Sequence, residues 1–225
     1  STLLWADLTN IYIWTLIFVS LSLGGLGLLD DILKIKFKNS QGLSSRYKFL
    51  GQLIISSLAL FILIKFSDHD YLYDLYFPFF KNFVWYMGLF FIPFGLFVII
   101  GASNAVNLTD GLDGLATVPV MLVALSFTLI SYVVGNTIFS EYLKIQYIPD
   151  VGELSIFCGS IVGACLGFLW YNAPPAKIFM GDTGSLSLGG SLAAIAIIVK
   201  HEIVLAIIGG LFVLETASVI IQVIS

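Results

Sequence analysis

The chain has 225 residues, of which 59% are hydrophobic and 11% are charged, and its mean hydropathy is +1.02. These values exclude an ordinary soluble domain and indicate an integral membrane protein. The formal net charge of −4 says little about partners, because the placement of Lys and Arg in a membrane protein carries more information than their sum. We expect membrane lipid around the chain and no nucleic-acid partner.

Apolar segments recur along the whole chain, separated by short polar stretches. A helix needs about 20 apolar residues to cross roughly 30 Å of hydrocarbon, whereas a barrel would show alternating segments of about ten residues. The pattern therefore predicts an all-α, polytopic bundle of transmembrane helices that forms a single membrane domain over residues 1–225. About seven spans are expected, at 11–29, 49–66, 83–100, 115–134, 154–171, 186–199 and 203–223.

The basic residues predict the orientation of these spans. Five of the ten lie in the first loop between spans, 30–48, and the positive-inside rule makes that loop cytoplasmic. Alternation then places loops 101–114 and 172–185 on the same side, so three polar loops share the cytoplasmic face. The remaining loops, at 67–82, 135–153 and 200–202, are expected on the opposite, outer side of the membrane.

Two adjacent carboxylates, Asp30 and Asp31, close the first predicted span, and Lys34 follows one turn later. Asp commonly marks a helix end in water, which is the structural interpretation. The functional interpretation is that two acids this close disfavour joint ionisation unless a cation relieves them, and this tunes a base or a metal ligand.

The basic loop that follows has two interpretations as well. It is a topology signal that contacts anionic lipid, or part of it lies in the interface as an amphipathic segment whose cations gather phosphates, with Ile35, Phe37 and Leu43 facing lipid. The outer loop 67–82 is rich in Tyr and Phe, and we expect an aromatic cap there, with a hairpin as one option and no chemistry.

The stretch 104–114 places polar side chains every three residues, at Asn104, Asn107, Asp110 and Asp113. Capping alone would explain one Asp but not the recurrence. We expect Asp110 or its neighbour Thr109 to cap the next helix, so that Asp110 and Asp113 share its first turn. The free N–H groups of such a turn favour an anionic or uracil-like ligand. Glycines at 111 and 114 allow the backbone close approach to a ligand or another helix.

The loop 172–185 contains Pro174 and Pro175, which keep it non-helical. Phe179 offers a ring for stacking a base, and Asp182 offers the hard oxygen that Mg²⁺ prefers. An ordinary Pro/Gly turn is the alternative. In the last span Glu215 is expected to face the bundle interior or to be protonated, and a buried structural hydrogen bond explains it as well as a catalytic role.

These segments, taken in order, resemble the polyprenyl-phosphate N-acetylhexosamine-1-phosphate transferase family. The resemblance spans nearly the whole chain, and the Asn-Ala-Pro-Pro and Arg-Tyr-Lys sequences favour the muramoyl branch of the family. No single segment is decisive, but together they are specific. The matching segments are 29–31 with 44–52, 104–116, 172–175 with 179–185, and 211–216.

The resemblance implies an enzyme that transfers phospho-MurNAc-pentapeptide from UDP-MurNAc-pentapeptide to undecaprenyl phosphate, giving lipid I and UMP with Mg²⁺ as cofactor. It implies catalytic roles for Asp30, Asp31 and Asp182, with Asp182 as the Mg²⁺ ligand and Asp31 as a second candidate ligand. The residues it implies for the nucleotide and substrate surface are Lys34, Lys48, Asn107, Asp110, Gly111, Leu112, Asp113, Asn172, Phe179, Gly181, Ser185 and Gln222.

The resemblance also implies a multi-pass protein of the bacterial plasma membrane, with its active site on the cytoplasmic face. The family has two further N-terminal spans and a histidine-rich segment after the last span, so we expect this chain to be part of a ten-span protein. The oligomeric state stays open, with a homodimer among the options.

Two alternatives remain open at this point. A sibling transferase would use UDP-N-acetylglucosamine with the same kind of lipid phosphate. A carboxylate-lined transporter would place acids near the bilayer midplane, whereas only Glu215 lies well inside a predicted span.

Overall fold

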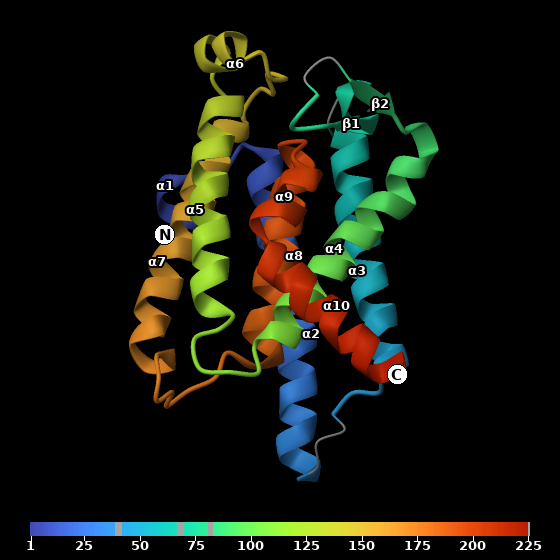
Figure 1. The fold of residues 1–225 in the computed structure, drawn as a ribbon. Coiled ribbons are helices and arrows are strands. Elements are labelled where there is room, and N and C mark those ends of the chain that lie inside the picture. The colour runs from blue at the N-terminus through green and yellow to red at the C-terminus, as the bar shows by residue number, and fades with distance from the viewer. Residues whose placement is uncertain (39–41, 67–69, 81–82, 225) are drawn as a thin grey trace.

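The structure is a computed structural model that describes residues 1–38, 42–66, 70–80 and 83–224 (Figure 1). The gaps fall in the predicted basic loop and in the predicted aromatic outer loop. What the sequence predicts for residues 39–41, 67–69 and 81–82 therefore lies outside the described residues.

Helices make up most of the described chain. Six of them are long and apolar enough to cross a membrane, and a bent pair, α9 with α10, would make a seventh span. The predicted all-α, polytopic bundle is confirmed. The helices are α1 Thr2–Trp5, α2 Ile11–Phe37, α3 Ser45–Phe66, α4 Phe91–Thr109, α5 Thr117–Val134, α6 Thr137–Leu143, α7 Leu154–Asn172, α8 Gly181–Ile198, α9 Glu202–Ile208 and α10 Gly210–Ile224, with short 3-10 turns at Asp70–Tyr73, Gly88–Phe90 and Val151–Glu153.

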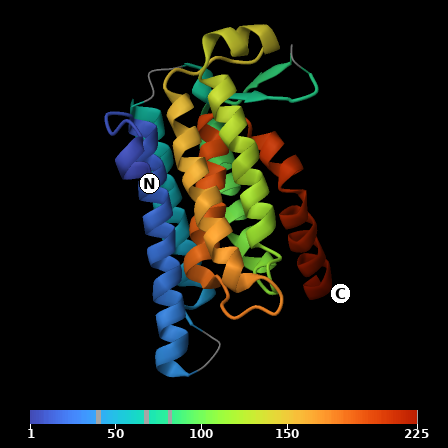
Figure 2. The same cartoon turned by 90° about the vertical axis from the view of Figure 1, so that its left-hand side faces the viewer.

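The central element is α8, which packs chiefly against α2 and α4 (Figures 1 and 2). In its most apolar stretch 67% of the residues are buried, against 28–39% in the other five candidate spans. Small residues permit this packing, as is usual where membrane helices approach closely. A Cβ atom at Gly27 of α2 would collide with the backbone carbonyl of Asp182, and one at Gly189 would lie 2.5 Å from the carbonyl oxygen of Ala102.

Several helices depart from the bounds expected from sequence. Two continue past the predicted end of the apolar run, α2 to Phe37 and α4 to Thr109. Helical hydrogen bonding can continue into polar sequence when the polar side chains find partners or water. The last predicted span, 203–223, bends by 77° at Gly209 between α9 and α10.

The end of the bundle at the top of Figure 1 carries an antiparallel hairpin, in which strand β1, Asp74–Tyr76, pairs with β2, Val84–Tyr86. The hairpin option for the aromatic loop is confirmed for its first strand. The second strand lies where the third span was expected to begin, so the predicted start of that span at residue 83 is wrong and α4 begins only at Phe91. Beside the hairpin, Lys200 follows the end of α8 and is fully enclosed. Its Nζ donates to the Leu72 carbonyl at 3.0 Å and to Glu202 Oε1 at 2.8 Å, and lies 4.6 Å from the ring centroid of Phe91.

Candidate active site

A polar network lies at the opposite end of the bundle, at the lower end in Figure 1. Asp30 and Asp31 project from α2, and Asp182 projects from the first turn of α8. One carboxylate oxygen from each of the three lies within 4.8 Å of the other two. The close packing of α2 and α8 therefore brings together carboxylates that are about 150 residues apart in the sequence.

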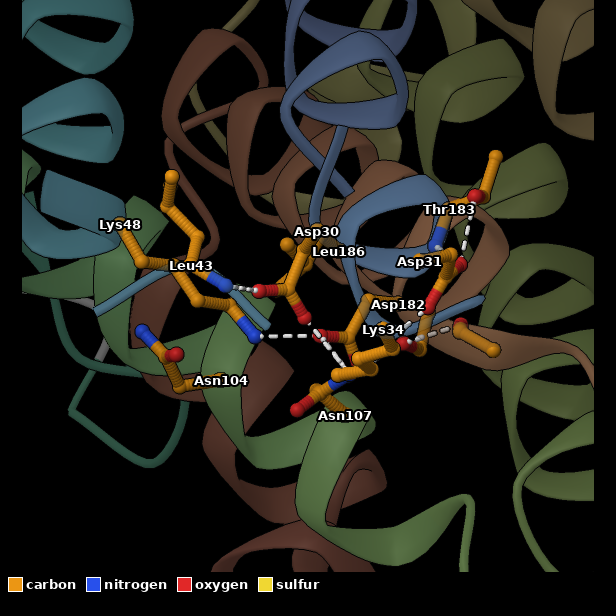
Figure 3. A network of polar contacts seen from close by, with 12 residues as sticks. Asp30, Asp31, Lys34, Leu43, Lys48, Asn104, Asn107, Asp182, Thr183 and Leu186 are labelled. Atoms are coloured by element: carbon orange, nitrogen blue, oxygen red, sulfur yellow. Dashed lines mark hydrogen bonds and ion pairs between the residues drawn. The ribbon is translucent and has the colours of Figure 1, made fainter. Parts of the chain in front are cut away.

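Two lysines hold this cluster together (Figure 3). Lys34 Nζ lies 2.6 Å from Asp30 Oδ2, 2.9 Å from Asp182 Oδ2 and 3.7 Å from Asp31 Oδ1. Lys48, in the first turn of α3, places its Nζ 2.7 Å from the same Asp182 Oδ2. Two ammonium groups thus offset three carboxylates, which is the cationic relief that the sequence analysis required.

The adjacent carboxylates Asp30 and Asp31 have different surroundings. The side chain of Asp30 is 4% exposed, and its Oδ1 accepts the backbone N–H of Leu43 at 2.6 Å, so it fixes the segment before α3. The side chain of Asp31 is 27% exposed. Its Oδ2 accepts both the N–H and the hydroxyl of Thr183, at 3.0 and 2.7 Å. Asp31 is therefore the member of the pair that faces open space.

The start of α8 places backbone donors at the site. Gly181 adopts a left-handed φ of 68°, and a Cβ atom there would lie 3.0 Å from Asp31 Oδ2. Its N–H donates to Asp110 Oδ2 at 2.9 Å, and the Thr183 N–H donates to Asp31. Both carboxylates thus lie at the positive end of a helix dipole, which stabilises their charge.

The prediction that Asp110 and Asp113 share the first turn of the next helix is wrong. Asp110 is the C-cap of α4, and α5 begins only at Thr117, so both carboxylates lie in the connecting loop. Asp113 Oδ2 accepts the N–H of Ala176 at 2.9 Å, as Asp110 accepts that of Gly181. Asp113 therefore fastens loop 110–116 to loop 173–180, Asp110 fastens it to the start of α8, and the helix start at the site belongs to α8.

The pKa of Asp110 is raised to about 6, first by burial and then by the negative charges of Asp182 and Asp31. The hydrogen bonds from the backbone of Gly181 and Met180 act in the opposite direction. The charge of Asp110 therefore changes about two pH units above the range of an ordinary aspartate.

Amide side chains connect the cluster to the surrounding loops. Asn107 Nδ2 donates to Asp182 Oδ1 at 2.6 Å and to Ser185 Oγ at 2.8 Å. Asn172 is buried, and its amide accepts from the hydroxyl of Thr117 at 2.6 Å and donates to the carbonyl of Ile178 at 3.0 Å. Asn107 thus orients Asp182, whereas Asn172 shapes loop 173–180.

Three of the residues expected to bind the nucleotide lie on the surface of these two loops. Leu112 and Phe179 are exposed, as is Gly111, so their surfaces are open to a ligand. Gln222 is different, because it lies exposed on α10, a helix that contacts mainly α4 and α9, and its Nε2 donates to Ser218 Oγ. The structure does not bring Gln222 into the carboxylate cluster.

Some residues that shape the site were not predicted from the sequence. Thr183 stands next to Asp182, so its place in the Gly-Asp-Thr-Gly sequence was a usable signal. The Leu43 N–H carries no side-chain signal, and the contact of Thr117 with Asn172 depends on how α5 and α7 pack.

The three carboxylates offer the hard oxygen donors that Mg²⁺ prefers. One oxygen of each lies within 4.8 Å of the other two, so the group is compact enough for two or three of them to approach one ion. Mg²⁺ usually binds one or two protein carboxylates and completes its shell with water and substrate phosphates. Asp182 and Asp31 are the more accessible of the three, which matches the two ligand candidates from the sequence.

Fold and site together define a multi-spanning membrane protein with a carboxylate and lysine centre at one end of its bundle. The sequence model described as glycosyl transferase family 4 matches residues 13–200. The chain therefore belongs to this family, and the family-level resemblance drawn from its motifs is confirmed.

Curated relatives are similar over nearly the whole chain. A phospho-N-acetylmuramoyl-pentapeptide-transferase of Pelagibacter ubique is 65% identical over 223 residues, which are 99% of this chain and 62% of the relative. Proteins of the same name from Rickettsia prowazekii and Rickettsia felis are 58% and 59% identical, with the same coverage. The chain thus spans about three fifths of the length of these relatives.

Proposed function

We propose that this chain carries the catalytic centre of an enzyme that transfers phospho-MurNAc-pentapeptide from its UDP carrier to undecaprenyl phosphate, forming lipid I and UMP. A phosphate oxygen of the lipid attacks the phosphorus attached to the sugar. The bond from that phosphorus to the UMP oxygen breaks, and UMP leaves.

The observation that carries this proposal is the meeting of Asp30, Asp31 and Asp182 with Lys34 and Lys48 at one end of a membrane bundle. Joining two phosphorylated substrates concentrates negative charge, so the site must supply cations and a group that accepts a proton. A site at the end of the bundle can be reached by a lipid from the membrane and by a nucleotide from water. The names of the relatives support the choice of substrates.

The contacts suggest a role for each charged residue. Asp31, the more exposed of the adjacent pair, is our candidate for the base that takes a proton from the lipid phosphate. Asp30 holds Lys34 and the segment at Leu43 in place. Lys34 and Lys48 would turn towards the substrate phosphates, which are stronger acceptors for an ammonium group than a carboxylate already paired elsewhere.

A magnesium ion is part of the proposal, with Asp182 as its ligand. Asp31 is the second candidate ligand, and because a carboxylate that binds the ion is a poor proton acceptor, its roles as ligand and as base are alternatives. Bound there, the ion would withdraw charge from the phosphate oxygens and so ease the displacement. Asn107 would keep Asp182 oriented through Oδ1, and Oδ2 would take the ion once Lys34 and Lys48 have turned from it to the substrate phosphates. Leu112 and Phe179, exposed on adjoining loops, would contact the uracil.

The site is proposed to face the cytoplasm of a bacterial plasma membrane. Its end of the bundle carries the basic residues Lys36, Lys38 and Arg46, as the positive-inside rule requires. Cysteine labelling from either side of sealed vesicles, at an exposed position such as Arg46, would test this orientation.

In the direct test, the purified protein with its complete native sequence is incubated with undecaprenyl phosphate and with one of two nucleotides, UDP-MurNAc-pentapeptide or UDP-N-acetylglucosamine. Release of UMP with the muramoyl nucleotide is the expected result. Turnover of UDP-N-acetylglucosamine alone would instead establish the sibling transferase. Omission of Mg²⁺ should stop the reaction, and its unchanged rate with chelator present would remove the metal from the proposal.

A further inference from the structure

A pair of amide side chains links α3 to α4 one helical turn from the active site. Gln52 Nε2 donates to Asn104 Oδ1 at 3.3 Å, and Asn104 Nδ2 donates back to Gln52 Oε1 at 3.0 Å. Asn104 Nδ2 also donates to the carbonyl of Ile100 at 2.8 Å. Gln52 is 1% exposed, and such a buried amide is expected to keep its partners because an unpaired one is costly in an apolar environment.

Both members of this pair stand on the same helix face as a residue that contacts Asp182. Gln52 follows Lys48 by four positions on α3, and Asn107 follows Asn104 by three positions on α4. Residues three or four apart are neighbours on a helix surface. Figure 3 shows Asn104 on the Lys48 side of the network and Asn107 beside Asp182.

Together these contacts form a closed loop of side chains and helix segments that runs from Asp182 through α3 to the Gln52–Asn104 pair and back through α4. Asp182 Oδ2 contacts Lys48 Nζ at 2.7 Å, and Asp182 Oδ1 accepts from Asn107 Nδ2 at 2.6 Å. The Gln52–Asn104 pair closes the other side, one turn away along each helix. A closed loop of this kind fixes the sliding and rotation of α3 against α4, which a single contact with Asp182 would leave free.

Lys48 needs such support more than Lys34 does. It lies in the first turn of α3, immediately after the segment that begins at Gly42, whereas Lys34 stands inside the long helix α2 with Asp30 one turn before it. Of the described side-chain contacts, the Gln52–Asn104 pair is the polar link between α3 and α4 nearest to Lys48.

We infer that Gln52 and Asn104 are positioning residues for the transfer reaction, and that they act by holding the helix segments that carry Lys48 and Asn107 in register beside Asp182. This inference rests on the proposed function. Neither amide touches the reacting groups, so their effect reaches the reaction through Lys48 and Asn107. Displacing a positioned group by about 1 Å can lower a rate about 100-fold.

The test replaces Gln52 with Met, which keeps the length of the side chain and removes both amide hydrogen bonds. We expect kcat to fall about 10-fold or more, and KM for the UDP substrate to rise by a smaller factor, because Lys48 loses its position at the phosphates while the loops at Leu112 and Phe179 are untouched. The matched control is Ser56→Ala, one turn further along α3. Ser56 is buried, and its Oγ has no hydrogen-bond partner among the described residues, so this variant should keep normal turnover.

A second measurement does not depend on turnover. Lysine-specific labelling followed by mass spectrometry compares the modification rates of Lys48 and Lys34 in one sample, whose side chains are 18% and 34% exposed. Gln52→Met should raise the rate of Lys48 at least threefold relative to Lys34, since only Lys48 loses its support. An unchanged ratio in folded Gln52→Met protein would overturn the inference.

The exchange variant Gln52→Asn with Asn104→Gln covers the case in which Gln52→Met does not fold. It keeps two amides and the summed side-chain length, so it should restore the labelling ratio and most of kcat. If the single exchange Gln52→Asn behaves like the double one, the pair does not act as a unit and the inference fails. If the unmodified protein turns over neither nucleotide, the proposed function fails, while the labelling result still decides on the positioning role.

Discussion

The two ends of α8 carry the same chemistry in opposite settings. At its start Asp182 meets Lys34 and Lys48, all three of which keep some exposure to solvent. Just beyond its end Lys200 meets Glu202, and both side chains are only 1% exposed. The lysine–carboxylate contacts at the start of α8 are therefore accessible to solvent, whereas the contact beyond its end is enclosed and structural.

Access and the number of partners make the difference. The Asp182 cluster has three carboxylates for two lysines and is partly exposed, so it carries a negative charge that, in our proposal, a bound cation offsets before the anionic substrates arrive. Lys200 instead uses the Leu72 carbonyl, Glu202 and the ring of Phe91. Leu72 lies in the 3-10 turn Asp70–Tyr73, Glu202 in α9 and Phe91 in α4. We therefore interpret the contact as one that holds this 3-10 turn against the helix bundle.

The strongest test of this comparison removes the charge of Asp182. Asp182→Asn should lower UMP formation about 10³-fold or more, because the cation ligand is lost. The variant should still fold in detergent, because the amide oxygen still accepts from Asn107, although the contacts with Lys34 and Lys48 are weakened. Near-normal turnover would remove Asp182 from the metal role, and Glu141→Gln, an exposed outer position, is the control.

The matching test at the other end is Lys200→Met. It leaves Glu202 buried without its cation, which should cost about 3–5 kcal/mol in the free energy of unfolding. Turnover per folded molecule should stay within about twofold at low temperature. Adding Glu202→Leu should recover most of the lost stability, because an apolar pair can replace a buried ion pair; a double variant as unstable as the single one would contradict this.

A smaller effect is expected from Thr183→Val, which keeps the side-chain shape and removes one donor to Asp31 Oδ2. A hydrogen bond to a charged group contributes roughly 1.5 kcal/mol, so kcat should fall about 10-fold. The backbone N–H of Thr183 still holds Asp31, and therefore KM for the nucleotide should not move. A change in KM alone would show that Thr183 contacts the substrate instead.

The smallest effect concerns Asp110, whose pKa of about 6 lies above its ordinary value of 3.8. A carboxyl with a raised folded-state pKa favours the fold most when protonated. Its contribution to the free energy of unfolding is complete below about pH 4 and is lost as pH rises through about 6. Asp110→Asn stays neutral, so its unfolding midpoint relative to the unmodified protein should rise between about pH 4 and pH 7. A difference that is constant over this range would show that burial does not disfavour the charge of Asp110.

Much of the fold could be predicted from the sequence because long apolar runs leave helices as the economical solution in lipid. Charge placement also predicted that the loops bearing Asp30, Asp31 and Asp182 share one face, and the structure brings these carboxylates together. The extension of α4 to Thr109 could not be read off, because Asn104 and Asn107 look like loop residues until Gln52 and Asp182 supply partners.

The same reason explains why the helix start was assigned to the wrong place. Asp110 and Asp113 have the spacing of a first turn, but their carboxylates accept from backbone N–H groups that lie 71 and 63 residues further along the chain. The enclosed pair of Lys200 and Glu202 was missed as well, since a charged residue between two apolar runs normally indicates a solvated loop. Only the positions of Leu72 and Phe91 around Lys200 distinguish the two cases.

The close approach at Gly27 determines how the protein tolerates mutation. The residue has no functional group, yet its missing side chain sets the spacing at which α2 presents Asp30 and Asp31 to the start of α8. Even a methyl group would push the two backbones apart, and the carboxylates of Asp30 and Asp31 would move away from that of Asp182. In a saturation mutagenesis screen for activity this position should accept glycine alone, so its sensitivity would match that of the aspartates.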